Sequence, residues 1–180
     1  MTLMTQIETV IQPAGSHEEH PAHVIGFLFK ALHHSLRHAM DESLRRHQID
    51  LSFAHFVTLF GVYCEPGING ASLARRGMVS AQTMNAVLRR LERDGRIERR
   101  PHPDSRRADS WYVTATGASL LQRARVVGDS VFEHMLSALQ EDETARLLSY
   151  MRRCIKALES VTETADTGCR SATQKILTAT

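Results

Sequence analysis

The amino-acid sequence predicts a mainly α-helical protein with one β-hairpin. Aromatic residues make up only 6% of the 180 residues, whereas Leu, Val, Ala and Met are plentiful, which suits packed helices better than a β-sandwich. Apolar residues recur at helical spacing along most of the chain. A single basic, turn-rich segment between two short β-forming stretches interrupts that spacing. At this length we expect one domain.

Two helices are expected in the first third of the chain. Residues 1–21 lack helical periodicity, so we expect a flexible N-terminal segment there. A first helix over about 22–48 follows from apolar residues at helical spacing, namely Ile25, Leu28, Leu32, Leu36, Met40 and Leu44. A second helix begins after Leu51, with Ser52 as its N-cap, and ends at Pro66-Gly67.

A short helix and a longer amphipathic helix come next. The short helix covers 71–76, and the longer one runs from about Ser80 to Asp94, with Gly95 following its C-cap. At about 100° per residue, one stripe of the longer helix is apolar and comprises Met84, Val87, Leu88 and Leu91. The opposite side presents Gln82, Asn85, Ala86, Arg89 and Arg93. One face therefore packs, and the other is free to bind.

A β-hairpin and two further helices complete the expected elements. Two short strands around residues 97–100 and 110–113 flank a basic loop and form a hairpin, or wing. Thr114 caps a long helix, and a last helix runs from Glu141 to about Leu158. Residues 160–180 are rich in Thr, Ala and Ser and are expected to form a C-terminal tail.

Positive charge is concentrated in one segment of the chain. The formal net charge is only +2, yet residues 75–107 contain ten Arg against four acidic residues. A solvated helix face would interleave acids with the basic residues, and acids are sparse here. Such a concentration in a nearly neutral protein indicates a surface that binds phosphate groups.

Several classes of protein are disfavoured by the sequence. The N-terminus lacks the basic start and apolar run of a signal peptide, and no stretch is as long as a membrane span. The three cysteines contain no C-x-x-C pair, which argues against a disulfide framework or zinc finger and suits a cytoplasmic protein. No phosphate-binding glycine loop or hydrolase motif is present, so we expect neither an enzyme nor a cofactor.

The order of the elements is that of a winged helix-turn-helix with additional N- and C-terminal helices and a two-stranded β wing. A helix such as the one over 80–94 fits the major groove of DNA, while a basic hairpin reaches the adjacent minor groove. Gln82 and Asn85 suit adenine edges, and Arg89 and Arg93 suit guanine or phosphate. The sequence therefore predicts binding to double-stranded DNA.

From about Leu51 to Gly117 the sequence resembles the MarR family (multiple antibiotic resistance regulators), most strongly over 73–76, 87–100 and 106–117. The resemblance implies that the recognition helix carries Ser80, Gln82, Thr83 and Asn85. It also implies that Arg107, beside Arg106, enters the minor groove from the wing. One departure is Ser105, where many members have an Asp that partners this arginine, although Asp104 is adjacent.

The resemblance further implies a ligand-responsive regulator, by family default a repressor, that binds a palindromic operator as a homodimer. The MarR-type domain would cover 22–159, with the winged part at about 50–115 and dimerisation helices at about 22–48 and 114–159. A homodimer is also expected from the residues themselves, because the apolar stripes of the terminal helices exceed what a small winged domain alone could cover.

Effectors in the family, often phenols or aromatic acids, bind between the dimer helices and the winged part. Candidate residues for such a pocket are His34, His38, His55 and Tyr63. The alternative is that the histidines are hydrogen-bonded at a helix interface. The spacing of His34 and His38 could hold a metal, but the fifth helix offers only His134, so we expect no metal site.

Two other functions remain open at this point. Some relatives sense peroxide through a cysteine, but Cys64 lies elsewhere and is better interpreted as a small buried hydrophobic residue. A winged helix can also serve as a protein-interaction module without DNA binding, in which case its outer face should be apolar or acidic. Trp111 in the second strand of the wing is interpreted as a packing residue.

Overall fold

The computed structural model describes the backbone of residues 21–102 and 105–177 and the side chains of residues 24–101 and 109–159. The chain forms two compact units, Met1–Glu133 and His134–Thr180, which are described separately. The predicted flexible N-terminal segment lies outside the described residues except for Pro21, which begins the first described helix.

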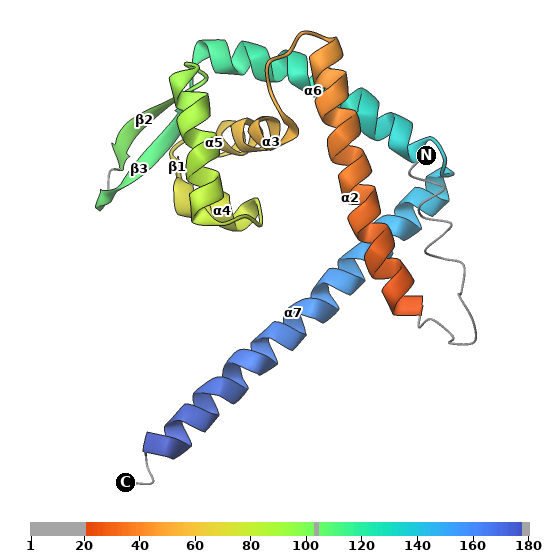
Figure 1. Cartoon of the computed structure of the whole chain (residues 1–180), viewed down its shortest axis with the longest axis vertical. Coiled ribbons are helices and arrows are strands. Elements are labelled where there is room, and N and C mark those ends of the chain that lie inside the picture. Colours follow the sequence, from red (N-terminus) through yellow and green to blue (C-terminus); the bar gives the residue numbers. More distant parts are fainter. Residues whose placement is uncertain (1–20, 103–104, 178–180) are drawn as a thin grey trace. The chain divides into compact units, whose positions relative to one another are not determined.

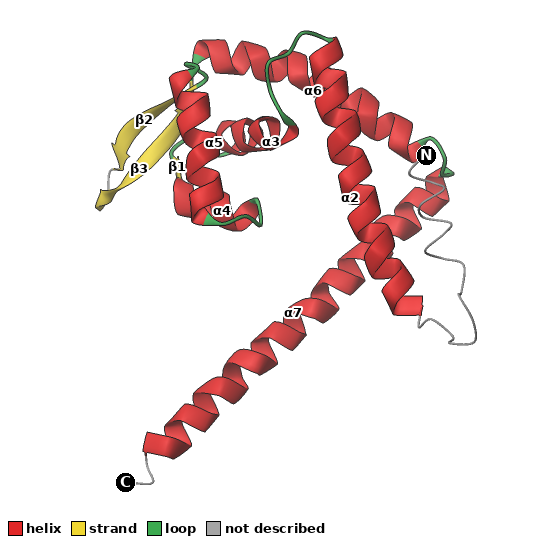
Figure 2. Ribbon diagram, viewed as in Figure 1, coloured by secondary structure: helices red, strands yellow, loops and turns green. Residues whose placement is uncertain are grey.

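The described part of the first unit combines helices with a small sheet (Figures 1 and 2). Its helices are α2 (Pro21–Arg46), α3 (Phe53–Cys64), α4 (Gly70–Arg76), α5 (Ala81–Arg93) and α6 (Ala115–Leu136), the last of which ends in the second unit. Its strands are β1 (Ile68–Asn69), β2 (Ile97–His102) and β3 (Ser105–Val113). This order confirms the predicted mainly helical fold with a β wing.

The sheet has one strand more than the sequence predicted. β3 is the central strand and pairs antiparallel with β2 on one side and β1 on the other. The added strand pairs Ile68 with Trp111 and Asn69 with Ser110. Two residues are too short for a periodic signal, and the preceding Pro66-Gly67 was interpreted only as a helix stop. Gly67 has φ of 89° and donates its N–H to the Trp111 carbonyl oxygen over 2.8 Å, which leads the chain into β1.

One hydrophobic core holds the first unit together. Its most deeply buried apolar side chains come from α2, α3, α5, β2 and α6, and include Met40, Leu44, Leu59, Val62, Leu88, Leu91, Ile97 and Leu121. Trp111 is also buried, as predicted for a packing residue. Because α5 and the wing both contribute side chains to this core, the core fixes their relative orientation.

Side-chain caps define several helix ends in the first unit. Ser52 caps α3, as predicted, and Ser80 caps α5, because each side chain accepts a backbone N–H of the first turn. Thr114 Oγ1 accepts the N–H of Gly117 over 3.0 Å and donates to the Gly95 carbonyl oxygen over 2.7 Å. A Cβ at Gly117 would lie 1.9 Å from the Arg96 carbonyl oxygen, so glycine is required where α6 starts beside the wing.

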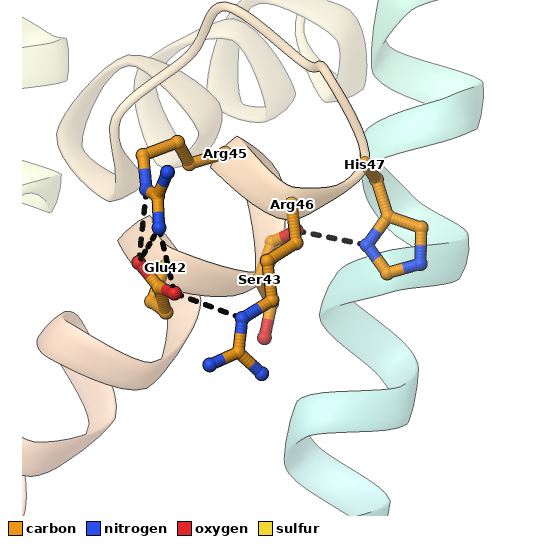
Figure 3. A network of polar contacts seen from close by, with 5 residues as sticks. All are labelled: Glu42, Ser43, Arg45, Arg46 and His47. Carbon is orange, nitrogen blue, oxygen red and sulfur yellow. Dashed lines mark hydrogen bonds and ion pairs between the residues drawn. The ribbon is translucent and has the colours of Figure 1, made fainter.

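The C-terminal end of α2 carries a polar network (Figure 3). The Glu42 carboxylate accepts hydrogen bonds from Arg45 and Arg46, at 2.8 Å each, and these bonds lower the pKa of Glu42. The His47 ring nitrogen Nδ1 lies 2.8 Å from the Ser43 carbonyl oxygen. Basic side chains at this end also complement the partial negative charge of the helix C-terminus.

The described part of the second unit consists mainly of α7 (Glu141–Leu177). The predicted end near Leu158 is wrong, because the helix continues through most of the expected tail. Residues 159–177 contain no proline, so every residue in them keeps a backbone N–H for a helical hydrogen bond. No helix in the described part of the chain is long and apolar enough to cross a membrane.

Candidate nucleic-acid interface

The helix-turn-helix is built from α4 and α5. Asn69 caps α4 by accepting the N–H of Ser72 over 2.9 Å, and α5 follows after a short turn. Met84, Leu88 and Leu91 bury the inner face of α5 against the core, as the sequence predicted. The outer face of α5 is therefore held in a fixed orientation by the core beneath it.

The outer face of α5 is polar and exposed. Gln82, Asn85 and Arg89 are exposed, and no hydrogen bond or ion pair joins any of them to another described residue. Arg93 is also exposed and lies 4.0 Å from Asp94. An amide and a guanidinium group with free donors can bind base edges or phosphates. This confirms the predicted division of α5 into a packed face and a free face.

The remaining two candidates on this helix have structural partners. Ser80 Oγ accepts the N–H of Thr83 over 3.1 Å, and the two hydroxyl oxygens lie 2.8 Å apart. The two hydroxyl groups therefore fix the first turn of α5. Contact of Ser80 and Thr83 with DNA stays a prediction.

Arg90 has a different role from its neighbour Arg89. Its guanidinium donates to Asp94 over 2.5 Å and lies 3.7 Å from Asp50, which precedes α3. These carboxylates raise the pKa of Arg90 and offset its charge. Arg90 thus connects α5 with the segment before α3, while Arg89 is left free for a ligand.

Arg99 connects the wing to α5 through ionic contacts. Arg99 on β2 lies 3.4 Å from Glu92 of α5 and donates to Asp109 of β3 over 3.3 Å. The guanidinium of Arg100 stacks over the Tyr112 ring at 4.4 Å from its centroid. Arg106 and Arg107 belong to β3, but their side chains lie outside the described residues, as does Asp104.

The four predicted effector residues do not line one hollow within this chain. His34 and His38 are exposed on α2. His55 lines a hollow of about 460 Å³ between α3 and α5, whereas Tyr63 lines another of about 480 Å³ between α3 and α6. Burial lowers the pKa of His55, and the charge of Arg90 lowers it further. That these four residues act together stays a prediction.

The hollow at Tyr63 contains polar residues that the sequence interpretation missed. α6 contributes Ser119, Gln122 and Arg125 to its lining, beside the apolar wall of Leu121. The Arg125 guanidinium also lies over the Phe60 ring, 5.7 Å from its centroid. These polar residues are three apart along α6 and so share one side of the helix, which is the pattern that could have identified them. The sequence interpretation used only the apolar stripe of this helix. A cation, hydroxyl groups and the ring of Tyr63 together suit an aromatic anion.

Cys64 is exposed, which corrects the prediction of a buried small residue. It follows the buried Val62 by two positions on α3, and two positions on a helix point to nearly opposite sides. No group of three or more His, Cys, Asp or Glu residues in the described part of the chain could hold a metal ion.

Comparison with known proteins agrees with this architecture. A sequence model described as the MarR family matches residues 51–108. The transcriptional repressor Rv2887 of Mycobacterium tuberculosis is 36% identical over 103 residues, which cover 56% of this chain and 74% of Rv2887. The transcriptional regulator HosA of Escherichia coli is 30% identical over 123 residues, covering 67% and 91% of the two chains.

Solved structures share the fold. The structure of Rv2887 with salicylic acid, described as a MarR family protein, superposes with a TM-score of 0.59 at 28% identity and covers 76% of this chain and 98% of Rv2887. A MarR variant from Escherichia coli in complex with operator DNA gives a TM-score of 0.70 at 23% identity, with 77% and 99% coverage. The fold and the exposed polar face of α5 together define the class of the protein. It is a DNA-binding transcriptional regulator with a winged helix-turn-helix. The chain belongs to the MarR family.

Proposed function

We propose that this protein is a ligand-responsive repressor that binds an inverted-repeat operator as a homodimer in the cytoplasm. The observation that carries the proposal is the exposed outer face of α5, where Gln82, Asn85 and Arg89 have no partner among the described residues. The concentration of arginine in 75–107 adds the charge that phosphate binding requires. Rv2887 is named as a repressor, and the MarR variant is bound to operator DNA in its structure. Both similarities support a repressor that binds an operator.

Dimerisation is supported by apolar side chains that the chain itself leaves exposed. On α2 these are Ile25, Leu28, Phe29 and Leu32, each 40–50% exposed. On α7 they are Leu147, Leu148, Tyr150, Ile155 and Leu158. Apolar faces of this size are unusual on a monomer and suit a second copy related by a two-fold axis. Two recognition helices so related would meet major grooves about 34 Å apart, or a multiple of this.

The effector is proposed to be a small aromatic acid bound in the hollow between α3 and α6. Arg125 would bind its carboxylate, while Tyr63 and Leu121 would contact its ring. The volume of about 480 Å³ is ample for a single substituted ring. Salicylic acid in the Rv2887 structure supports this chemical class. To release the operator, the acid must bind the free conformation more tightly than the DNA-bound one.

The DNA-binding function is tested by two variants that should fail differently. Asn85→Ala removes a base-edge contact, so operator binding should weaken by about 1–3 kcal/mol while random-duplex affinity stays unchanged. Arg107→Ala removes a wing charge, so both affinities should weaken and the salt slope should fall by about one unit per arm. Fluorescence anisotropy with both duplexes over a salt series measures each quantity. Equal losses on both duplexes for Asn85→Ala would contradict base reading by α5.

The effector site is tested with salicylate as the probe. Arg125→Gln should weaken salicylate binding about 10-fold, because a charge-assisted hydrogen bond is lost. The matched control is Arg123→Gln, since Arg123 is exposed on the same helix but does not line the hollow. Calorimetry gives the affinities, and operator release by salicylate gives the response. If both variants bind like the wild type, the effector binds elsewhere.

A cysteine-based switch is a second candidate, favoured by the exposure of the Cys64 thiol. Treatment with hydrogen peroxide before operator titration tests it, with Cys64→Ser as the comparison. A peroxide effect in the wild type that the variant lacks would support the switch. Absence of binding to any duplex at low salt would instead favour a protein-interaction module.

A further inference from the structure

Met78 stands out in the turn that joins α4 to α5. Its side chain is 91% exposed, the highest value among the exposed large hydrophobic side chains of the described residues. The neighbouring Val79 is 41% exposed. Both residues directly precede Ser80, the N-cap of α5. An isolated exposed apolar side chain is ordinary on a protein surface, so the backbone beneath it decides whether this one is informative.

The backbone at Met78 adopts a conformation that favours glycine. Its φ is 51°, and it follows the C-cap of α4 in a Schellman motif. Met78 donates its N–H to the Arg75 carbonyl oxygen over 3.2 Å, and Val79 donates to that of Ala74 over 3.1 Å. A residue with a Cβ is disfavoured in this left-handed region. Methionine therefore occupies a position where glycine would be more stable.

Two other helices end in the same motif and provide the comparison. After α5 the equivalent position holds Gly95, with φ of 68°, and after α2 it holds the polar Gln48, with φ of 55°. Glycine and polar residues are the usual choices at such exposed turns. Met78 is thus disfavoured both by its backbone and by its exposure to water. Strain of this kind, where it persists, points to a function of the side chain.

We propose that Met78 contacts the C5-methyl group of a thymine in the major groove and so helps to determine operator specificity. This inference rests on the proposed DNA-binding function. In helix-turn-helix proteins the N-terminal residues of the recognition helix face the base edges, and Met78 lies two residues before the N-cap of that helix. Gln82 and Asn85 are exposed in the first turns of the same helix.

The chemistry of the side chain suits this ligand. The thymine methyl is the apolar group that a base presents in the major groove, and apolar side chains recognise it. Methionine has three rotatable bonds and a polarisable sulfur, so it can reach and adapt to such a group. Arg75, at the end of α4, supplies positive charge close to it in the chain, whereas the charge of Arg76 is offset by an ion pair with Glu65. Burial of the methionine on binding would offset the cost of leaving it exposed in the free protein.

Single replacements of thymine by uracil test the contact, because they remove the methyl group alone. The probe is an inverted-repeat duplex selected by the wild-type protein from a random pool, with each thymine of one half-site replaced in turn. Uracil at one position should weaken wild-type binding about 5- to 10-fold. Met78→Ala should weaken binding to the thymine duplex by a similar factor and lose nothing further with uracil at that position.

Stability measurements separate the side chain from the backbone. Met78→Gly should raise the melting temperature by about 2–4 °C while weakening operator binding as Met78→Ala does. The matched control is Gln48→Gly, which relieves the same backbone conformation and should raise the melting temperature equally with operator affinity unchanged. A variant that is more stable but binds less tightly cannot owe its loss of binding to unfolding.

Three results would overturn the inference. Met78→Ala could bind the operator within twofold of the wild type. Every uracil replacement could affect the wild type and Met78→Ala alike, which would place the side chain away from any thymine methyl. The selection could yield no duplex at all, a result that would overturn the DNA-binding function itself and this contact with it. The first two results leave the DNA-binding function intact.

Discussion

The two ends of α2 carry the same kind of side chain in opposite surroundings. Near its C-terminal end, Met40 and Leu44 are 0% exposed. Near its N-terminal end, Phe29 and Leu32 are 46% exposed, and Ile25 is 50% exposed. All five belong to an apolar set at helical spacing on one helix. The difference therefore arises from what the rest of the chain places against each end.

Specific contacts account for the packed end of α2. The Asp41 carboxylate accepts the N–H of Phe53 over 2.6 Å and so holds the start of α3 against this end. A Cβ at Gly128 of α6 would lie 3.5 Å from Met40 Cε and 3.4 Å from the Phe56 ring, which shows how closely α6 approaches. At the other end the apolar side chains are 40–50% exposed, and the proposed second subunit would cover them.

Shortening a side chain at each end should have very different effects. Leu44→Ala leaves a cavity in a packed core, so the free energy of unfolding should fall by about 2–5 kcal/mol. Leu32→Ala should cost well under half of this when unfolding is measured on dilute protein, because Leu32 is already 46% exposed within its own subunit. Urea titrations followed by circular dichroism measure both. Equal losses would show that the exposed end is packed by its own chain.

A charge on the exposed end should break the proposed dimer without unfolding the subunit. Leu32→Asp places two carboxylates in a two-fold interface, one from each copy, so the dimer dissociation constant should rise about 100-fold. Analytical ultracentrifugation over a dilution series gives this constant. Lys30→Asp, on an exposed polar position of the same helix, is the matched control. A dimer that tolerates Leu32→Asp would place the interface elsewhere.

Periodicity predicted the elements that pack on their own. The division of α5 into buried Met84, Leu88 and Leu91 and exposed Gln82, Asn85 and Arg89 followed from spacing alone. The caps at Ser52 and Thr114 followed from local chemistry, which needs no knowledge of distant parts. These features depend on neighbours within a few residues, and such neighbours are visible in a sequence.

Features that depend on distant segments were not predictable in this way. β1 exists because β3 lies beside it, and no pattern marks a strand of two residues. The hollow at Tyr63 requires α6 to lie against α3, so Arg125 was overlooked. The exposure of Cys64 depends on which side of α3 the other elements cover, and Cys64 lies nearly opposite the buried Val62. The continuation of α7 beyond Leu158 was missed because composition was weighed above the absence of proline.

His55 extends the comparison between packed and exposed surroundings to electrostatics. Its expected effect on stability is smaller. His55 lies in the first turn of α3, where its ring nitrogen Nδ1 is 2.6 Å from Ser52 Oγ. Burial lowers the pKa of His55 below 6.5, and Arg90 lowers it further, against the opposing charges of Asp94, Asp50 and Asp41. The folded state therefore binds a proton at His55 less readily than the unfolded state does.

The sign of the pH dependence follows from this lowered pKa. The contribution of His55 to stability is fully present above pH 6.5, the pKa of an unperturbed histidine. It is lost as the pH falls below 6.5 toward the lower pKa of the folded state. Between about pH 7.5 and about pH 5.5 the wild type should therefore lose more stability than His55→Gln, which cannot take up the proton. Urea midpoints at both pH values measure the difference. If His55→Gln loses as much stability as the wild type over this range, the imidazole is not responsible, and other groups that titrate there carry the pH dependence.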